Sequence, residues 1–173
     1  MKAGFILSLT VGTAVVCGLW VGFCAAIAYP LIVSWAGFAG CTSYFSSGGG
    51  PKNLIRSLIS NACGVAVACA IIFCGQAVPF GETLWFSMIS VGFFSGVMVY
   101  LMHCDFTKMA NLTFFGCFST FASGGNWKMV LLSMFLGNFV GVACDYCGKT
   151  IYKLIFEQKS KEEDWVILKI LKD

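Results

Sequence analysis

The sequence predicts an all-α integral membrane protein with six transmembrane helices, arranged as two inverted three-helix repeats and followed by a cytoplasmic C-terminal amphipathic helix. Three observations predict this fold: the composition, the spacing of the charges and an internal repeat. Hydrophobic residues make up 58% of the 173 residues and charged residues 11%, whereas soluble domains contain about 25% charged residues. The composition argues against a soluble enzyme, a disordered chain and a protein that binds nucleic acid through a basic surface.

Six uncharged stretches predict the six spans. They cover residues 3–29, 31–47, 57–75, 83–102, 109–123 and 129–144. A spanning helix needs about 17–25 residues, so the last two stretches need flanking residues or a locally thin bilayer. The first stretch is longer than the apolar core of about 7–15 residues in a secretory signal, and we expect it to be retained as a span.

The positions of the basic residues predict the orientation. With six spans and a cytoplasmic N-terminus, Lys128 is the only basic residue in the outer loops. A four-span alternative, with the second and fifth stretches re-entrant, would place Lys52, Arg56, Lys108 and Lys128 all outside. Because cytoplasmic loops carry an excess of lysine and arginine, we predict six spans with both termini in the cytoplasm.

An internal repeat relates the two halves of the chain. Three pairs of segments match: residues 38–52 with 114–128, residues 61–66 with 138–143, and residues 18–22 with 92–96. The shifts are 76, 77 and 74 positions, with one matched segment in each predicted helix of a half. Because each copy holds an odd number of spans, the second copy is expected to be inserted upside down.

The repeat divides the chain into three parts. We expect the first three-helix repeat at residues 1–78, the second, inverted repeat at residues 79–150, and a charged amphipathic cytoplasmic tail at residues 151–173. Inverted repeats are typical of many transporters, whose solutes bind near the bilayer midplane at the repeat interface. A shared architecture does not by itself define a function.

The matched segments also carry a resemblance to a known family. Residues 35–42, Trp-Ala-Gly-Phe-Ala-Gly-Cys-Thr, and residues 120–128, Thr-Phe-Ala-Ser-Gly-Gly-Asn-Trp-Lys, resemble the signature segments of the YcdZ-like small bacterial inner-membrane proteins. The resemblance covers about residues 5–150. It implies a multi-pass protein of the bacterial inner (plasma) membrane, and because the family is a domain of unknown function it implies no activity.

The predicted spans contain no acidic, basic or histidine residue at mid-membrane depth. A proton relay needs titratable groups inside the membrane, so the sequence favours passive movement of a small neutral solute. The candidate lining residues are hydroxyls, amides and aromatic side chains of the second, third, fifth and sixth stretches and their ends. They are Trp35, Thr42, Ser43, Phe45, Ser47, Asn61, Ser119, Thr120, Phe121, Ser123, Trp127 and Asn138.

A structural role is the alternative for each of these residues. Serine and threonine hydroxyls bond to their own helix, and asparagines hold neighbouring membrane helices together. Pairs of glycines four residues apart predict close helix packing. These pairs are Gly18 and Gly22, Gly92 and Gly96, and Gly137 and Gly141.

We therefore expect an inner-membrane channel or facilitator for a small neutral solute, acting as a homo-oligomer in the lipid bilayer. The alternative is a non-transporting membrane scaffold or accessory subunit that recruits a cytoplasmic partner through its tail. The membrane stretches and their loops contain no nucleophile elbow, phosphate-binding loop or paired carboxylates. We accordingly expect no enzymatic activity, no catalytic residue, no metal, no cofactor and no nucleic-acid partner.

Overall fold

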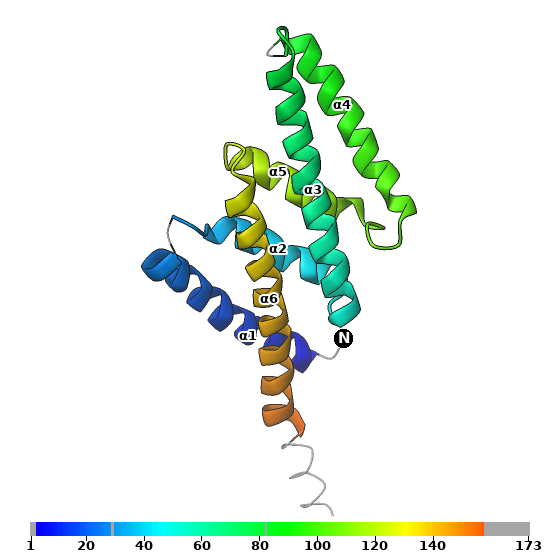
Figure 1. Cartoon of the computed structure of the whole chain (residues 1–173). Helices are drawn as coiled ribbons and strands as arrows, with labels where there is room; N and C mark the ends of the chain where they lie inside the picture. Colours follow the sequence, from blue (N-terminus) through cyan, green and yellow to red (C-terminus); the bar gives the residue numbers. More distant parts are fainter. Residues whose placement is uncertain (1–2, 29, 82, 158–173) are drawn as a thin grey trace, which may run out of the picture. The chain divides into compact units, whose positions relative to one another are not determined.

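The computed structural model describes residues 3–28, 30–81 and 83–157. Within these ranges the chain is helical and contains no strand (Figure 1). The α-helices are α1 (Ala3–Phe23), α2 (Ser34–Ser46), α3 (Pro51–Ala77), α4 (Leu84–Tyr100), α5 (Ala110–Ala122) and α6 (Trp127–Tyr152). Shorter helical turns follow α1, α4 and α6 at Cys24–Ala28, Leu101–His103 and Lys153–Glu157. Residues 158–173, which form most of the predicted amphipathic tail, lie outside the described residues.

Four helical segments of the described chain are long and apolar enough to cross a membrane. They are Gly4–Ala26, Pro51–Ala77, Leu84–His103 and Trp127–Ile155. The helices α2 and α5 contain 13 residues each and rise about 20 Å, less than the hydrocarbon thickness of about 30 Å. The prediction of an all-helical membrane protein is confirmed, while the second and fifth stretches form shorter helices than a regular span requires.

The sixth helix is longer than its uncharged stretch, residues 129–144. It continues through Asp145 and Lys149 to Tyr152. The Lys149 Nζ lies 2.6 Å from Asp145 Oδ2, and an ion pair of this i, i+4 spacing is compatible with a continuing helix. The first charged residue after an apolar stretch therefore does not mark the end of this helix.

The helices α2 and α5 end in the same way, at positions 76 residues apart. The backbone N–H of Gly49 donates to the carbonyl oxygen of Tyr44 (3.2 Å), and that of Gly125 donates to Thr120 (2.9 Å). The φ angles of Gly49 and Gly125 are +69° and +86°, a region that favours glycine. Glycines in this conformation are common helix terminators, so the repeated Ser-Gly-Gly sequence has a repeated structural role.

The chain folds as two compact units. The terminal unit consists of Met1–Val21 and Ala143–Asp173, as far as these are described, and the central unit consists of Gly22–Val142. In the terminal unit, small residues allow α1 to approach the end of α6. A Cβ atom on Gly12 would lie 2.8 Å from the backbone nitrogen of Gly148.

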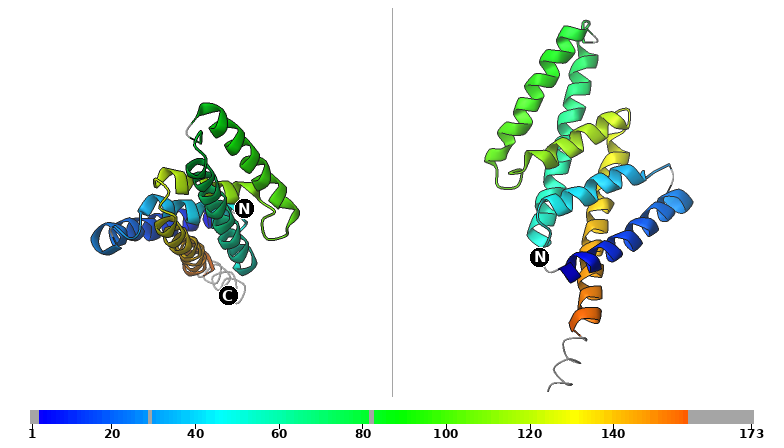
Figure 2. Two further views of the ribbon diagram at one scale, coloured as in Figure 1. Left: turned by 45° about the horizontal axis from the view of Figure 1, so that its top comes forward. Right: turned by 180° about the vertical axis from the view of Figure 1, so that it is seen from behind.

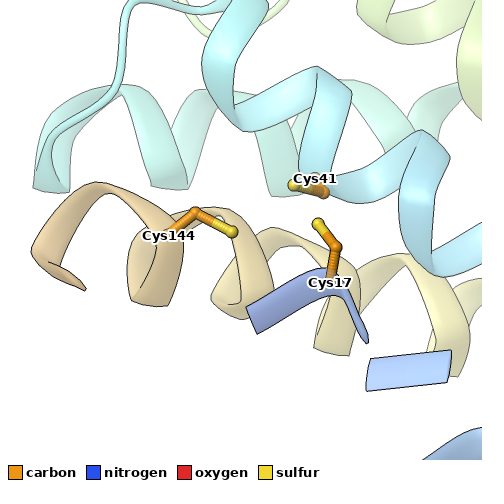
Figure 3. Close-up of side chains that lie close together, drawn as sticks. All are labelled: Cys17, Cys41 and Cys144. Atoms are coloured by element: carbon orange, nitrogen blue, oxygen red, sulfur yellow. The ribbon is translucent and has the colours of Figure 1, made fainter. Parts of the chain in front are cut away.

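Two cysteines of the terminal unit also face one another. The Sγ atoms of Cys17 on α1 and Cys144 on α6 lie within 4.8 Å of each other (Figure 3). Near the ends of the same helices, the rings of Phe5 and Tyr152 meet edge to face at 5.7 Å. Cysteine behaves as a small apolar residue in such packing, which agrees with the position of both residues in apolar runs.

In the central unit, α3 and the first part of α6 are antiparallel (Figure 1). The short helices α2 and α5 run across them and are antiparallel to each other (Figures 1 and 2). The helix α4 returns beside α3 after a tight turn, where a Cβ atom on Gly81 would overlap the backbone of Gly75. One buried cluster joins α2, α3 and α6, and a second joins α3, α5 and Met98 of α4.

Glycines make the crossings of this core very close. A Cβ atom on Gly64 of α3 would overlap the carbonyl group of Thr113 of α5, and one on Gly137 of α6 would overlap Gly37 of α2. Next to these contacts, Gly116 lies against the backbone of Asn61, and Gly40 lies against the backbone of Met134. Each short helix therefore crosses the long helix of the other predicted repeat with direct contact between backbones.

Candidate functional site

The two asparagines singled out by the sequence are buried in the central unit. Asn61 is 3% exposed and Asn138 is fully buried. The Ser43 hydroxyl lies 2.9 Å from Oδ1 of Asn61 and also reaches the carbonyl oxygen of Ala39. Asn138 Oδ1 accepts a hydrogen bond from Ser57 at 2.5 Å, and its amide nitrogen donates to the carbonyl oxygen of Met134. Both asparagines thus join different helices, as the structural alternative predicts.

One serine on each of α3 and α6 bonds to the segment that precedes the short helix of the other half. Ser133 Oγ of α6 accepts a hydrogen bond from the backbone N–H of Val33, just before α2 (3.0 Å). Ser60 Oγ of α3 donates to the carbonyl oxygen of Phe106, shortly before α5 (3.0 Å). These serines satisfy backbone groups in non-helical segments, which is needed wherever such segments lie at membrane depth.

The contacts relate α3 to α6 at a shift of 73 positions. Ser60 and Ser133 are equivalent because each bonds to the segment before the short helix of the other half. Gly64 and Gly137 are equivalent because each lies against the backbone of that short helix. The sequence match placed these helices at a shift of 77, which paired Asn61 with Asn138. The structure differs by about one helical turn, because the glycine contacts, and not the amides, determine where the helices cross.

At this shift, the two halves differ mainly in their polar residues. Asn61 corresponds to Met134. The backbone of Asn61 lies against Gly116 of α5, and the backbone of Met134 lies against Gly40 of α2. The buried hydroxyl of Ser119 has no hydrogen-bond partner among the described residues, since its counterpart Ser43 bonds to Asn61 and Met134 offers no equivalent group. The central unit therefore approaches twofold symmetry in its backbone contacts, but neither amide has an amide at the equivalent position of the other half, where Met134 and Val65 stand.

A groove of about 450 Å³ lies between α3 and α6 and contains both amides. It is lined by Leu58, Asn61, Ala62, Trp127, Lys128, Leu131, Leu132, Met134, Phe135 and Asn138. Its walls are apolar apart from the two amides and Lys128. Since Leu132 and Phe135 are 43% and 48% exposed, the groove opens toward the outside of the helix pair.

Asn61 carries the one amide donor of this groove that has no partner. Its Nδ2 is buried and makes no hydrogen bond to any described residue, whereas both polar atoms of Asn138 are bonded. A buried donor without a partner costs about 1–3 kcal/mol. A hydrogen-bond acceptor on a bound solute would satisfy this donor.

The remaining lining candidates are not brought together in the groove. Of the predicted aromatic walls, only Trp127 lines it, while Trp35, Phe45 and Phe121 are 37–43% exposed. Thr42 is exposed. The other hydroxyls bond mainly within their own helices or end them: Ser47 to Tyr44, Thr120 to Gly116, and Ser123 to Thr120.

The glycine pairs also differ in their surroundings. Gly141 lies against the ring of Tyr44, and Gly137 lies against Gly37. A Cβ atom on Gly18, Gly22, Gly92 or Gly96 would meet no other heavy atom within 4 Å among the described residues. These two pairs therefore leave small-residue faces of α1 and α4 open.

Sequence reasoning missed Ser57 and Lys128 as members of this region. Ser57 lies four residues before Asn61, on the same helical face, which was the available signal for its contact. Lys128 was noted only as an exception to the charge distribution, although it precedes Leu131 and Phe135 on one face of α6 at helical spacing. The partner helix of each residue was not evident from the sequence.

The different bonding of the two amides predicts different costs of removing them. We expect Asn138→Leu to lower the free energy of unfolding by about 1–3 kcal/mol, because Ser57 loses its buried partner. Asn61→Leu should have a much smaller effect, since Ser43 retains Ala39 and an unpartnered donor is removed. Unfolding by SDS in mixed micelles, followed by circular dichroism, measures both. Equal losses for the two variants would contradict this difference.

Comparison with known proteins gives a consistent family relationship. The family model described as "Protein of unknown function (DUF1097)" matches residues 10–149. Inner membrane protein YcdZ of Escherichia coli strain K12 is 34% identical over 149 residues, covering 83% of this chain and 85% of the relative. Inner membrane protein YcdZ of Salmonella typhimurium strain LT2 is also 34% identical, covering 83% and 87%.

A further relative carries no functional name. Uncharacterized protein YahC of Escherichia coli strain K12 is 32% identical over 149 residues, covering 78% of this chain and 90% of the relative. No solved structure matches the chain significantly. The sequence-based family resemblance is confirmed, and the names of the relatives agree with an inner-membrane location.

Proposed function

The chain belongs to the DUF1097 family of membrane proteins of unknown function, and we propose from its own geometry that it is a passive inner-membrane facilitator for a small neutral solute. The observation that carries this proposal is Asn61, a residue that lines the groove between α3 and α6 and whose buried Nδ2 lacks a partner among the described residues. The protein would have no enzymatic activity. Its solute would offer an acceptor oxygen to Asn61 and an apolar body to the groove walls.

The position of the amides along α6 supports a site at mid-membrane depth. Lys128 lies in the first turn of α6, and Asn138 lies ten residues later, about 15 Å along the helix. This is about half the hydrocarbon thickness of about 30 Å. If Lys128 marks the membrane interface, the amide end of the groove lies near the midplane, where inverted-repeat transporters hold their solutes.

The direction of the long helices supports the six-pass, inverted topology within this proposal. Antiparallel α3 and α6 (Figure 1) are required when six segments cross the membrane, whereas re-entrant α2 and α5 would make α3 and α6 parallel. The non-helical residues before α2, Leu31–Val33, add at most about 10 Å to a helix of about 20 Å. Together they reach at most about 30 Å, the thickness of a bilayer core, so crossing requires α2 and the long helices that it crosses to share the tilt from the membrane normal. Ser133 covers the backbone of Val33.

The open glycine faces support a homo-oligomer. Nothing in the described chain packs on Gly92 and Gly96 of α4, and many large side chains of this helix are exposed, whereas Met98 is buried. The exposed side chains include Leu84, Trp85, Met88, Ile89, Phe93 and Tyr100. Small residues four apart let membrane helices approach closely, so a second copy would pack here.

Solute flux into vesicles tests the proposed function. Purified protein in liposomes should accelerate swelling in a panel of small amides, alcohols and polyols relative to empty liposomes. The increase in swelling rate over empty liposomes should be lost in Asn61→Leu and in the Asn61→Leu, Asn138→Leu double variant, because the hydrogen bond to the solute is removed. No gradient of protons or sodium should be required, since no acidic side chain lines the groove.

A matched substitution separates the site from general effects of losing an asparagine. Asn111 lies on α5, is exposed and does not line the groove, so Asn111→Leu should leave the flux unchanged. If no solute of the panel moves faster than in empty liposomes, or if Asn61→Leu conducts like the native chain, the facilitator function is wrong.

A membrane scaffold or accessory subunit is the second candidate function. It is favoured by the polar pairs that hold helices together, Ser57 with Asn138 and Ser43 with Asn61, and by the close backbone contacts of the core. In this case the C-terminal tail would recruit a cytoplasmic partner. The absence of flux combined with a stable fold would favour this function.

A further inference from the structure

Lys128 at one end of the groove has no acidic partner within the described parts of the chain. The ion pairs found there are Lys108 with Asp105 and Lys149 with Asp145. The Lys128 side chain is exposed, lines the groove and lies 5.4 Å from the centre of the Trp127 ring. A positive charge is therefore available at the start of α6, where the helix dipole also favours an anion.

The groove beside this charge continues as an apolar strip. Leu131, Leu132 and Phe135 follow Lys128 at spacings of three, four and seven residues, so they lie on one face of α6. All three line the groove, and Leu132 and Phe135 are partly exposed. In a membrane protein, a face of this kind is open to lipid chains.

We propose that this end of the groove binds one anionic phospholipid. The lipid phosphate pairs with Lys128, the headgroup region lies beside Trp127, and one acyl chain lies along Leu131, Leu132 and Phe135. A soluble anion would contact Lys128 alone, whereas a lipid also covers the exposed apolar strip below it. The proposal does not depend on transport, because its charged contact is Lys128, ten residues before Asn138 along α6, and lipid binding is measured without any flux.

Quenching of tryptophan fluorescence by brominated lipids tests this site in the full chain. The protein is placed in phosphatidylcholine vesicles containing a small fraction of chain-brominated phosphatidylglycerol or, in parallel, of chain-brominated phosphatidylcholine. Comparison with Trp127→Phe isolates the contribution of Trp127. We expect the anionic lipid to quench Trp127 with about fivefold higher apparent affinity, the preference that one basic residue gives near an anionic surface.

Removal of the charge should abolish this preference. In Lys128→Gln the two brominated lipids should quench Trp127 equally, while Lys52→Gln, a first-turn lysine on α3 outside the groove, should retain the difference. Equal quenching by both lipids in the native chain would overturn the proposal. A preference that persists in Lys128→Gln would also overturn it, as general attraction of anionic lipid would then explain the result. Neither outcome bears on solute flux, which is measured separately.

Discussion

Replacement of Gly64 by alanine is expected to lower the free energy of unfolding by about 3 kcal/mol, the upper end of the usual cost of overpacking. A Cβ atom at this position would overlap the carbonyl group of Thr113 and lie 2.9 Å from the backbone nitrogen of Cys117. Because both neighbours are backbone atoms of α5, the helices must separate to admit the methyl group. Gly137→Ala should have a comparable effect through Gly37.

Glycines of the open faces provide the matched controls. Alanine at Gly18 or Gly92 would meet no atom within 4 Å among the described residues, so its higher helix propensity should stabilise the helix by up to about 1 kcal/mol. SDS-induced unfolding at low protein concentration measures all four variants. If Gly92→Ala were as destabilising as Gly64→Ala, the loss would reflect helix flexibility or an oligomer contact and not the crossings described above.

The sequence predicted the helices of this fold well, because their signals are local. Uncharged stretches locate α1, α3 and α4, and Ser-Gly-Gly at residues 47–49 and 123–125 ends α2 and α5. The length of α2 was less predictable. Ile32 and Val33 are as apolar as the helix that follows, but Val33 is extended (φ −116°, ψ 131°) and the helix begins only at Ser34. The free backbone N–H of Val33 is satisfied by Ser133, 100 positions away in the chain, a contact that no local pattern reveals.

The candidate site was predicted in part for the same reason. Composition identified Asn61 and Asn138 as unusual residues, and both line one groove. Their relation was not predictable from the repeat, because the matched segments align the two amides while the crossings pair Asn61 with Met134 at a shift of 73. Such a difference of one turn depends on which glycines meet which carbonyl groups, and this information lies in the contacts between helices.

The inverted topology predicts an all-or-none difference between two equivalent lysines. Lys52 and Lys128 lie in the first turns of α3 and α6, 76 positions apart, and both are exposed. When α3 and α6 cross the membrane in opposite directions, these first turns lie on opposite sides. Lys52→Cys should therefore react with a membrane-impermeant maleimide only from the cytoplasm, and Lys128→Cys only from the periplasm.

The labelling uses intact cells and inside-out vesicles, with the ten native cysteines replaced by alanine or serine. These two sites are preferable to Gly49 and Gly125, whose positive φ angles would strain a substituted cysteine. Labelling of both sites from the periplasm would mean that α2 and α5 re-enter the membrane and that α3 and α6 cross in the same direction. Because the described α3 and α6 are antiparallel (Figure 1), we expect labelling from opposite sides.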